Sequence, residues 1–289
     1  MFNTMLDFKE ISATACSIGW GAADILRSYY RGDADQKLNV QYKEDDPVTA
    51  ADLAVNHYIL QRLQAELSNV DFSYISEETY KEGETKEITS DLVWIIDPLD
   101  GTRDFIEKTG EYAIHIALVK EKRPILAVVV VPKADKLYYA IKGDGAFVNT
   151  PDGKSRPIKV SSREKVEDLT LVVSRFHRNP RLEYLLQNLP CQNQKAVGSV
   201  GCKITTILEQ EADIYISLSG KSAPKDWDMA APELILTEAG GKFTHFSGDE
   251  LKYNTGDINQ WGGLLASNGQ FHEYLCHKAE TILKTWDDK

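Results

Sequence analysis

The sequence lacks the features that mark secreted, membrane-spanning or zinc-binding proteins. Its four cysteines, Cys16, Cys191, Cys202 and Cys276, are scattered and form no Cys-x-x-Cys pair. This spacing argues against a disulfide framework or a zinc site and suits reduced thiols in the cytosol. The longest apolar run, Ile125 to Val131, is far too short to cross a bilayer.

Basic residues are outnumbered by acidic ones. The 33 lysines and arginines stand against 44 aspartates and glutamates, which gives a formal net charge of −11. Binding to a nucleic-acid polymer needs a basic surface, so we expect no such partner, whereas a small anionic substrate is still allowed. The first ten residues carry acids where a signal peptide would have a basic region and an apolar core. We therefore expect no export signal and a cytoplasmic location.

The most informative segment is Trp-Ile-Ile-Asp-Pro-Leu-Asp-Gly-Thr at residues 94–102. Leu92 to Ile96 is rich in β-branched and aromatic residues and predicts a strand buried on both faces. Asp97 should lie at the carboxyl end of this strand, which Pro98 is expected to stop. Asp100 then turns back toward Asp97, and the carbonyl of Leu99 points the same way. Two carboxylates and a carbonyl in one turn favour a hard-cation site.

A helix is expected to begin at Gly101 and Thr102 and to continue through Ile106. Its free N–H groups would face an anion brought in by the metal ions. The alternative is an ordinary turn between a strand and a helix, in which Asp97 caps and Asp100 is the N-cap of the helix.

Three further acidic residues occupy similar settings, and each has a structural alternative. Glu77 follows the strand-like segment 72–76 but could belong to an exposed acidic turn. Asp52 lies three residues after Thr49, which is the spacing of a capping box. Asp228 could be the N-cap of a helix that ends before Gly240.

These segments resemble the signatures of the inositol monophosphatase superfamily in order and spacing, over about residues 8 to 270. The segment from Asp100 to Ile106, with Gly110-Glu-Tyr and Ser174-Arg-Phe-His177, is similar to the CysQ-type 3'(2'),5'-bisphosphate nucleotidases. The matching segments are Val48 to Asp52, Ser76 to Glu78, Asp97 to Thr102, Gly143 to Phe147, Trp227 to Ala231 and Glu238 to Gly241.

The resemblance implies a site for two or three Mg²⁺ ions. Glu77, Asp97 and the Leu99 carbonyl would bind one ion, and Asp97 would bridge to a second ion held by Asp100 and Asp228. All these donors are oxygens, as hard cations require. The ions would polarise the phosphate and activate a water molecule.

The resemblance also implies catalytic and substrate-binding residues. Asp52 and Thr102 would orient the attacking water, and Asp52 would accept its proton. Other residues would contact the substrate, with Gly198 to Lys203 as a loop and helix start that grips a second phosphate. An ordinary glycine-containing helix start and a surface histidine are the alternatives for this loop and for His177. The substrate-binding set is Gly101, Thr102, Ser174, His177, Gly198, Ser199, Lys203 and Asp228.

The implied activity is a Mg²⁺-dependent phosphomonoesterase of sulfur metabolism, sensitive to lithium, that hydrolyses 3'-phosphoadenosine 5'-phosphate to AMP and phosphate. The 5'-phosphosulfate form is a second substrate. Inositol monophosphatase or fructose-1,6-bisphosphatase activity, or a non-catalytic nucleotide sensor, are the alternatives. The partner would be a small phosphorylated nucleotide, with no membrane, and the protein a monomer or homodimer.

The expected fold is α/β (α+β), the layered αβαβα sugar-phosphatase fold with mixed, largely antiparallel sheets. The length of the chain, 289 residues, suggests two subdomains, residues 1–155 and residues 156–289. They would share one cleft and be joined at a turn-rich segment. Pro232 departs from the family, which often has Gly there, and would fall at the fourth helical position if Asp228 is the N-cap. Helices are predicted at 8–29, 49–67, 202–211 and 229–239, and strands at 72–76, 92–96, 113–119, 125–131, 136–141, 145–149, 169–173, 213–217 and 264–267.

Overall fold

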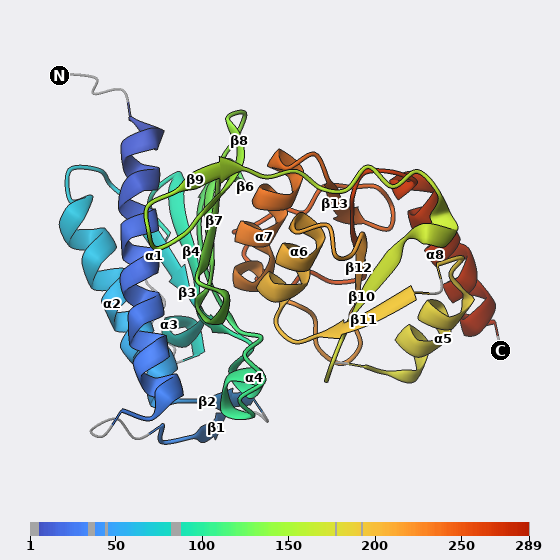
Figure 1. The fold of residues 1–289 in the computed structure, drawn as a ribbon, viewed down its shortest axis with the longest axis horizontal. Coiled ribbons are helices and arrows are strands. Elements are labelled where there is room, and N and C mark those ends of the chain that lie inside the picture. The colour runs from blue at the N-terminus through green and yellow to red at the C-terminus, as the bar shows by residue number, and fades with distance from the viewer. Residues whose placement is uncertain are drawn as a thin grey trace.

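The computed structural model describes residues 6–33, 38–43, 46–81, 88–176, 178–191 and 193–288, which form five alternating layers of helix and sheet (Figure 1). The outer pair α1 (Phe8–Arg31) and α2 (Ala50–Glu66) covers one face of the first sheet. The central layer is α6 (Val200–Leu208) with α7 (Asp226–Glu238). On the far side of the second sheet lie α5 (Pro180–Asn188) and α8 (His272–Asp287). The predicted αβαβα layering is confirmed.

The first sheet has the strand order β3-β4-β5-β6-β7-β8-β9. Strand β3 runs parallel to β4, and every other neighbouring pair is antiparallel, as the short connections predicted. The predicted strands 136–141 and 145–149 are confirmed to the residue. The strands are β3 (Ser73–Ser76), β4 (Leu92–Asp100), β5 (Ala113–Lys120), β6 (Arg123–Val131), β7 (Lys136–Ile141), β8 (Gly145–Asn149) and β9 (Ser155–Pro157).

The second sheet has the order β11-β10-β12-β14-β13, with β10 parallel to both of its neighbours. Its strands are β10 (Thr170–Ser174), β11 (Asn193–Val197), β12 (Ile214–Leu218), β13 (Lys242–His245) and β14 (Gly263–Ser267). The remaining elements are short: the pair β1 (Gln41–Lys43) and β2 (Asp46–Val48), the helices α3 (Glu77–Lys81) and α4 (Thr102–Ile106), and the 3₁₀ turns η1 (Pro132–Ala134) and η2 (Val166–Asp168).

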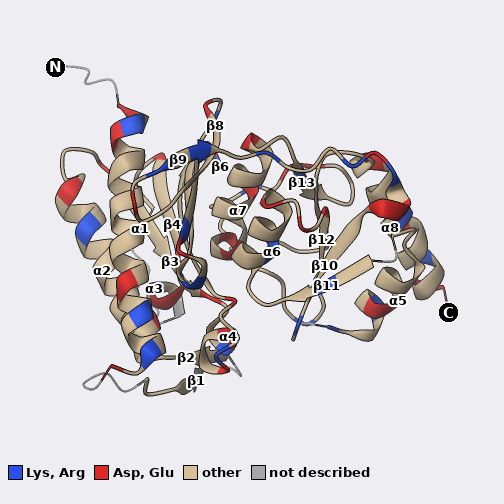
Figure 2. Cartoon of the chain, in the orientation of Figure 1, with Lys and Arg blue, Asp and Glu red and all other residues tan. Residues whose placement is uncertain are grey.

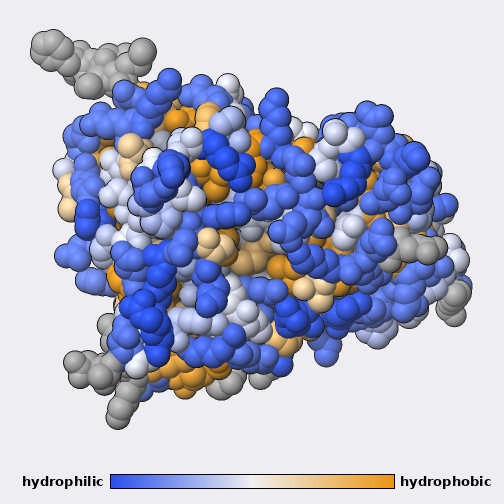
Figure 3. All heavy atoms as spheres, viewed as in Figure 1, coloured by the Kyte–Doolittle hydropathy of each residue, from blue (hydrophilic) through white to orange (hydrophobic). Residues whose placement is uncertain are grey.

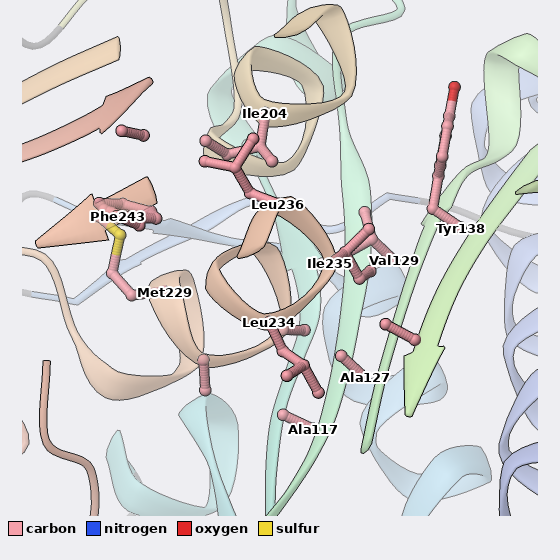
Figure 4. Packing of buried hydrophobic residues seen from close by; sticks show 14 of the residues in the cluster. Ala117, Ala127, Val129, Tyr138, Ile204, Met229, Leu234, Ile235, Leu236 and Phe243 are labelled. Atoms are coloured by element: carbon pink, nitrogen blue, oxygen red, sulfur yellow. The ribbon is translucent and has the colours of Figure 1, made fainter. Parts of the chain in front are cut away.

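Helix α7 is buried between the two sheets. In Figure 4, Leu234 points to Ala127 of the first sheet, Ile235 lies beside Val129, and Leu236 faces α6. A helix that is apolar on most of its surface is expected to be enclosed in this way, and each fully buried side chain contributes about 1.5–3 kcal/mol. Residues from both halves of the chain form this core. The division into two subdomains near residue 155 therefore stays a prediction.

Two predicted boundaries beside the acidic residues are wrong, and the helix predicted at 202–211 is found at Val200–Leu208. Pro98 does not stop β4, because the strand continues to Asp100 and the pairing with β5 shifts between Asp97 and Asp100. An irregularity of this kind tolerates the missing N–H of a proline. Helix α7 begins at Asp226, so Asp228 is not its N-cap, and Pro232 lies inside the helix rather than at its fourth position.

The molecular surface is mixed in polarity and charge. Figure 3 shows a largely hydrophilic face, with small hydrophobic areas along its middle. Acidic and basic residues are interspersed along α1 and α8 (Figure 2). In the part of the chain that the structure describes, no helix has the length and apolar character needed to cross a membrane.

Candidate active site

The acidic residues from the first half meet where the parallel pairing of β3 with β4 ends. These strands are parallel, with Ser76 beside Ile96, so Glu77 and Asp97 follow at the same edge of the sheet. Asp97 is 1% exposed. Burial raises the pKa of its carboxyl well above the usual value, and the nearby Glu77, Asp100 and Asp228 raise it further. The exposed-turn alternative for Glu77 is thereby disfavoured, because Glu77 is partly buried against this edge.

The bulge after Asp97 arranges the next residues around it. The Leu99 N–H donates to Asp97 Oδ1 at 3.0 Å, and Thr102 Oγ1 donates to the Leu99 carbonyl at 3.1 Å. Gly101 adopts a φ of 88°, which favours glycine, and leads into α4 as predicted. A Cβ on Gly101 would lie 2.8 Å from that of Ser199, so the second half of the chain packs directly on this turn.

Asp52 combines the capping role with a contact to this turn. Asp52 Oδ2 accepts from the Thr49 N–H at 2.8 Å, which confirms the capping box at the start of α2. Its other oxygen, Oδ1, accepts from Thr102 Oγ1 at 3.1 Å. Burial raises the pKa of Asp52 to about 6, with a further increase from Glu77, despite the hydrogen bonds from Thr49 and Thr102. A buried carboxyl of raised pKa is suited to exchanging a proton.

Asp100 faces the start of α6. It accepts from the Val200 N–H at 3.2 Å and from the Gly201 N–H at 2.6 Å, and its Oδ2 lies 3.1 Å from His115 Nε2. Burial alone would raise the pKa of Asp100, but His115, the Gly201 N–H and Lys203 outweigh burial and lower it. Asp100 is therefore a charged carboxylate stabilised by the dipole of a helix from the other half of the chain.

Asp228 reaches the same region from α7. Lys225 is the N-cap of α7, and Asp228 is the third residue of the helix. Asp228 Oδ2 accepts a hydrogen bond from the Lys225 N–H at 2.7 Å. Burial, followed by the charge of Asp100, raises the pKa of Asp228 to about 7. The first sheet and helix α7 thus bring together carboxylates that are far apart in the sequence.

Within the described residues, no three acidic, histidine or cysteine side chains are already gathered in an arrangement that could hold a metal ion. The carboxylates instead accept hydrogen bonds from backbone N–H groups. Their chemistry nevertheless fits a hard divalent cation, because all the donors are oxygens and nearby carboxylates raise the pKa of both buried acids, Glu77, Asp100 and Asp228 that of Asp97, and Asp100 and Glu77 that of Asp228. A cation would relieve this repulsion once the side chains turned toward it.

The predicted substrate loop lies against this site. Ser199 is the N-cap of α6, which confirms that the segment from Gly198 opens a helix. The Gly198 N–H donates to Glu111 Oε2 at 2.7 Å. Lys203 is buried and donates to the Gly198 carbonyl, and burial lowers its pKa. Because the first N–H groups of α6 bind Asp100, a phosphate contact at this helix start would compete with Asp100.

The second predicted substrate segment follows β10. Ser174 is buried at the end of the strand. Arg175 forms an ion pair with Glu111 at 2.6 Å, and the Arg103 guanidinium lies 4.1 Å from the centre of the Phe176 ring. His177, a predicted contact, lies outside the described residues.

Two residues of the site were not predicted. His115 lies in a largely apolar strand and forms no local motif, whereas Glu111 was noted only as part of the Gly110-Glu-Tyr segment and given no role. One feature of the sequence could have indicated His115: it is a histidine in an apolar run that should be fully buried, and a buried histidine needs polar partners.

Comparison with solved structures shows the same fold in known phosphatases. The inositol monophosphatase from Anabaena superposes with a TM-score of 0.76 and 24% identity, covering 97% of this chain and 100% of that chain. CysQ from Bacteroides thetaiotaomicron, described as a bacterial member of the inositol monophosphatase family, gives a TM-score of 0.72 and 26% identity, covering 92% of this chain and 100% of that chain.

The sequence match is equally extensive. The inositol monophosphatase family model matches residues 7–284, and the chain belongs to this family. A relative from Buchnera aphidicola, named 3'(2'),5'-bisphosphate nucleotidase CysQ, is 34% identical over 250 residues, which cover 86% of this chain and 89% of the relative. The protein of the same name from Aggregatibacter actinomycetemcomitans is 31% identical over 234 residues, covering 81% of this chain and 83% of the relative.

Proposed function

We propose that this protein is a metal-dependent phosphomonoesterase that converts 3'-phosphoadenosine 5'-phosphate to AMP and phosphate. The 5'-phosphosulfate form is a second substrate in the proposal. Relatives that carry the name 3'(2'),5'-bisphosphate nucleotidase match more than four fifths of the chain, which supports this assignment over the inositol phosphate and fructose bisphosphate alternatives. Against the nucleotide sensor alternative, the sequence has an acidic residue at every position that the proposed metal site needs.

One observation carries the proposal: buried carboxylates from both halves of the chain converge beside the Gly101-Thr102 turn. Glu77, Asp97 and the Leu99 carbonyl, together with Asp100 and Asp228, would hold two or three Mg²⁺ ions. Bound Mg²⁺ would polarise the phosphate and lower the pKa of a water molecule.

The residues of the chain have their own tasks in the reaction. Thr102 and Asp52 orient the attacking water through their mutual hydrogen bond, and Asp52 accepts its proton. The water oxygen bonds to phosphorus, the bond from phosphorus to the ribose oxygen breaks, and that oxygen takes up a proton. The N–H groups of Gly101 and Thr102 stabilise the charge on the phosphate oxygens.

The nucleotide would lie along the segments that the second half contributes. Ser174, His177, Gly198 and Ser199 are the proposed contacts, and Lys203 adds positive charge behind the Gly198 carbonyl. The enzyme would act in the cytoplasm as a monomer or a homodimer.

Phosphate release from three substrates tests the proposal: 3'-phosphoadenosine 5'-phosphate, inositol 1-phosphate and fructose 1,6-bisphosphate. Each is measured with Mg²⁺, with a chelator, and with Mg²⁺ plus millimolar lithium. We expect the highest kcat/KM for the nucleotide, no turnover with the chelator, and inhibition by lithium. A higher kcat/KM for either sugar phosphate would overturn the substrate assignment, and turnover unaffected by the chelator would overturn the metal dependence.

A further inference from the structure

His115 lies between the two halves of the acidic site. It is part of β5 and is 0% exposed. Its Nδ1 lies 3.1 Å from the carbonyl oxygen of Trp227, and its Nε2 lies 3.1 Å from Asp100 Oδ2. The Nε2 contact is not aligned as a hydrogen bond, so this nitrogen has close packing with the carboxylate rather than an ideal partner.

The ring connects residues that would otherwise repel. Trp227 is the residue before Asp228 in the first turn of α7, whereas Asp100 ends β4. Asp100 raises the pKa of Asp228, which means that the two buried carboxylates repel each other. The imidazole contacts the carbonyl of Trp227, the residue before Asp228, and the carboxylate of Asp100, so the ring lies between the two acidic residues.

The surroundings pack tightly on the ring. Gly201 packs against it so closely that a Cβ there would lie 2.7 Å from the Cβ of Ala113 and closer still to His115 Nε2. Gly201 is also the residue whose N–H binds Asp100 at 2.6 Å. Strand β5, helix α6 and helix α7 consequently meet around a single side chain.

We propose that His115 is a positioning residue that sets the distance between Asp100 and Asp228 and so prepares them to share a divalent cation. This inference rests on the metal site of the proposed function. A residue behind the metal ligands affects the affinity for the ion, because an ion binds best where its oxygen donors are already in place. Loss of such a positioning residue typically lowers the metal affinity about 10- to 100-fold.

Three variants separate positioning from space filling. His115→Leu keeps an apolar side chain of similar bulk and removes both polar contacts. His115→Asn keeps an amide at the depth of Nδ1, within reach of the Trp227 carbonyl. His115→Gln keeps an amide at the depth of Nε2, beside Asp100. The matched control is His272→Leu, because His272 is also buried but contacts Ser267 and Thr244 instead.

The experiment measures Mn²⁺ and Mg²⁺ binding to the full chain by calorimetry without substrate, together with thermal unfolding of each variant. We expect His115→Leu to weaken binding about 10- to 100-fold and at least one amide variant to recover most of the affinity. His272→Leu should lower the unfolding temperature without changing the dissociation constant.

Two results would overturn the inference while leaving the metal site intact. One is an unchanged dissociation constant in His115→Leu, and the other is an equal loss in all three His115 variants, since the ring would then act only by its shape. If the parent protein binds neither ion, the proposed metal site fails and the role of His115 fails with it.

Discussion

Thr102 Oγ1 and Asp52 Oδ1 lie 3.1 Å apart although fifty positions separate them in the sequence. The same hydroxyl is 3.1 Å from the Leu99 carbonyl, and Asp52 is also the capping residue of α2. A single hydroxyl therefore links the start of a long helix to the turn that carries the acidic motif.

Removal of the Thr102 hydroxyl should slow the reaction without preventing binding. Thr102→Val keeps the shape of the side chain but leaves Asp52 without this partner, so we expect kcat to fall about 100-fold with little change in KM. Thr102→Ser should retain most of the rate. Steady-state phosphate release measures both variants, and a Thr102→Val enzyme as fast as the Ser variant would exclude the hydroxyl from the reaction.

Asp97→Asn should abolish activity and leave the fold at least as stable. Asp97 is buried among like charges, so neutralising it removes repulsion and should keep the fold stable. Loss of a metal ligand should lower the activity by more than the roughly 100-fold that is typical for residues behind the ligands. Thermal unfolding and phosphate release are measured together. The control is Asp226→Asn, since Asp226 is also buried but binds Asn254 and Gln260 and should lose stability instead. Near-normal activity in Asp97→Asn would remove Asp97 from the metal site.

Gly201→Ala should destabilise the protein by about 1–3 kcal/mol, because the added methyl group overlaps His115 and Ala113. The change is measured by denaturant unfolding. Gly220→Ala is the control, since the nearest atom to a Cβ there is 3.6 Å away, and it should change the free energy of unfolding little. Equal stabilities for the two variants would mean that β5 and α6 yield more easily than the structure indicates.

His272 should make stability depend on pH. It is 3% exposed, and burial, followed by the charge of Lys242, lowers its pKa from 6.5 to about 4. The folded protein therefore binds fewer protons than the unfolded chain, so the stability present above pH 6.5 is lost as the pH falls toward 4. The loss is at most about 3 kcal/mol. His272→Gln removes this contribution, and the difference between the two unfolding curves measures it; parallel curves across this window would refute the assignment.

The sequence predicted best those elements that local chemistry determines. Strands 136–141 and 145–149 follow from short runs of mostly apolar and aromatic residues on either side of a turn with Gly143 and Gly145, both with positive φ. The capping box of Thr49 and Asp52 is equally local. The acidic motif could be located because each carboxylate follows a recognisable strand or begins a helix.

Contacts between distant residues were beyond such patterns. The continuation of β4 through Pro98 depends on a bulge against β5, which the sequence of β4 alone does not encode. Strand β11, largely exposed and without apolar alternation, was not predicted because its pairing with β10 determines it. His115 acquires its role only when α7 places Trp227 against it.

The two faces of the first sheet are covered at different times during synthesis. Helices α1 and α2 precede all of its strands, whereas α7 emerges from the ribosome only after the last strand, β9, and several further elements. Until then the face around Ala117, Ala127 and Val129 is bare apolar surface on a nascent chain. Nascent chains that display such surfaces aggregate readily, so the yield of this protein in cells will depend on chaperones that shield the sheet until α7 arrives.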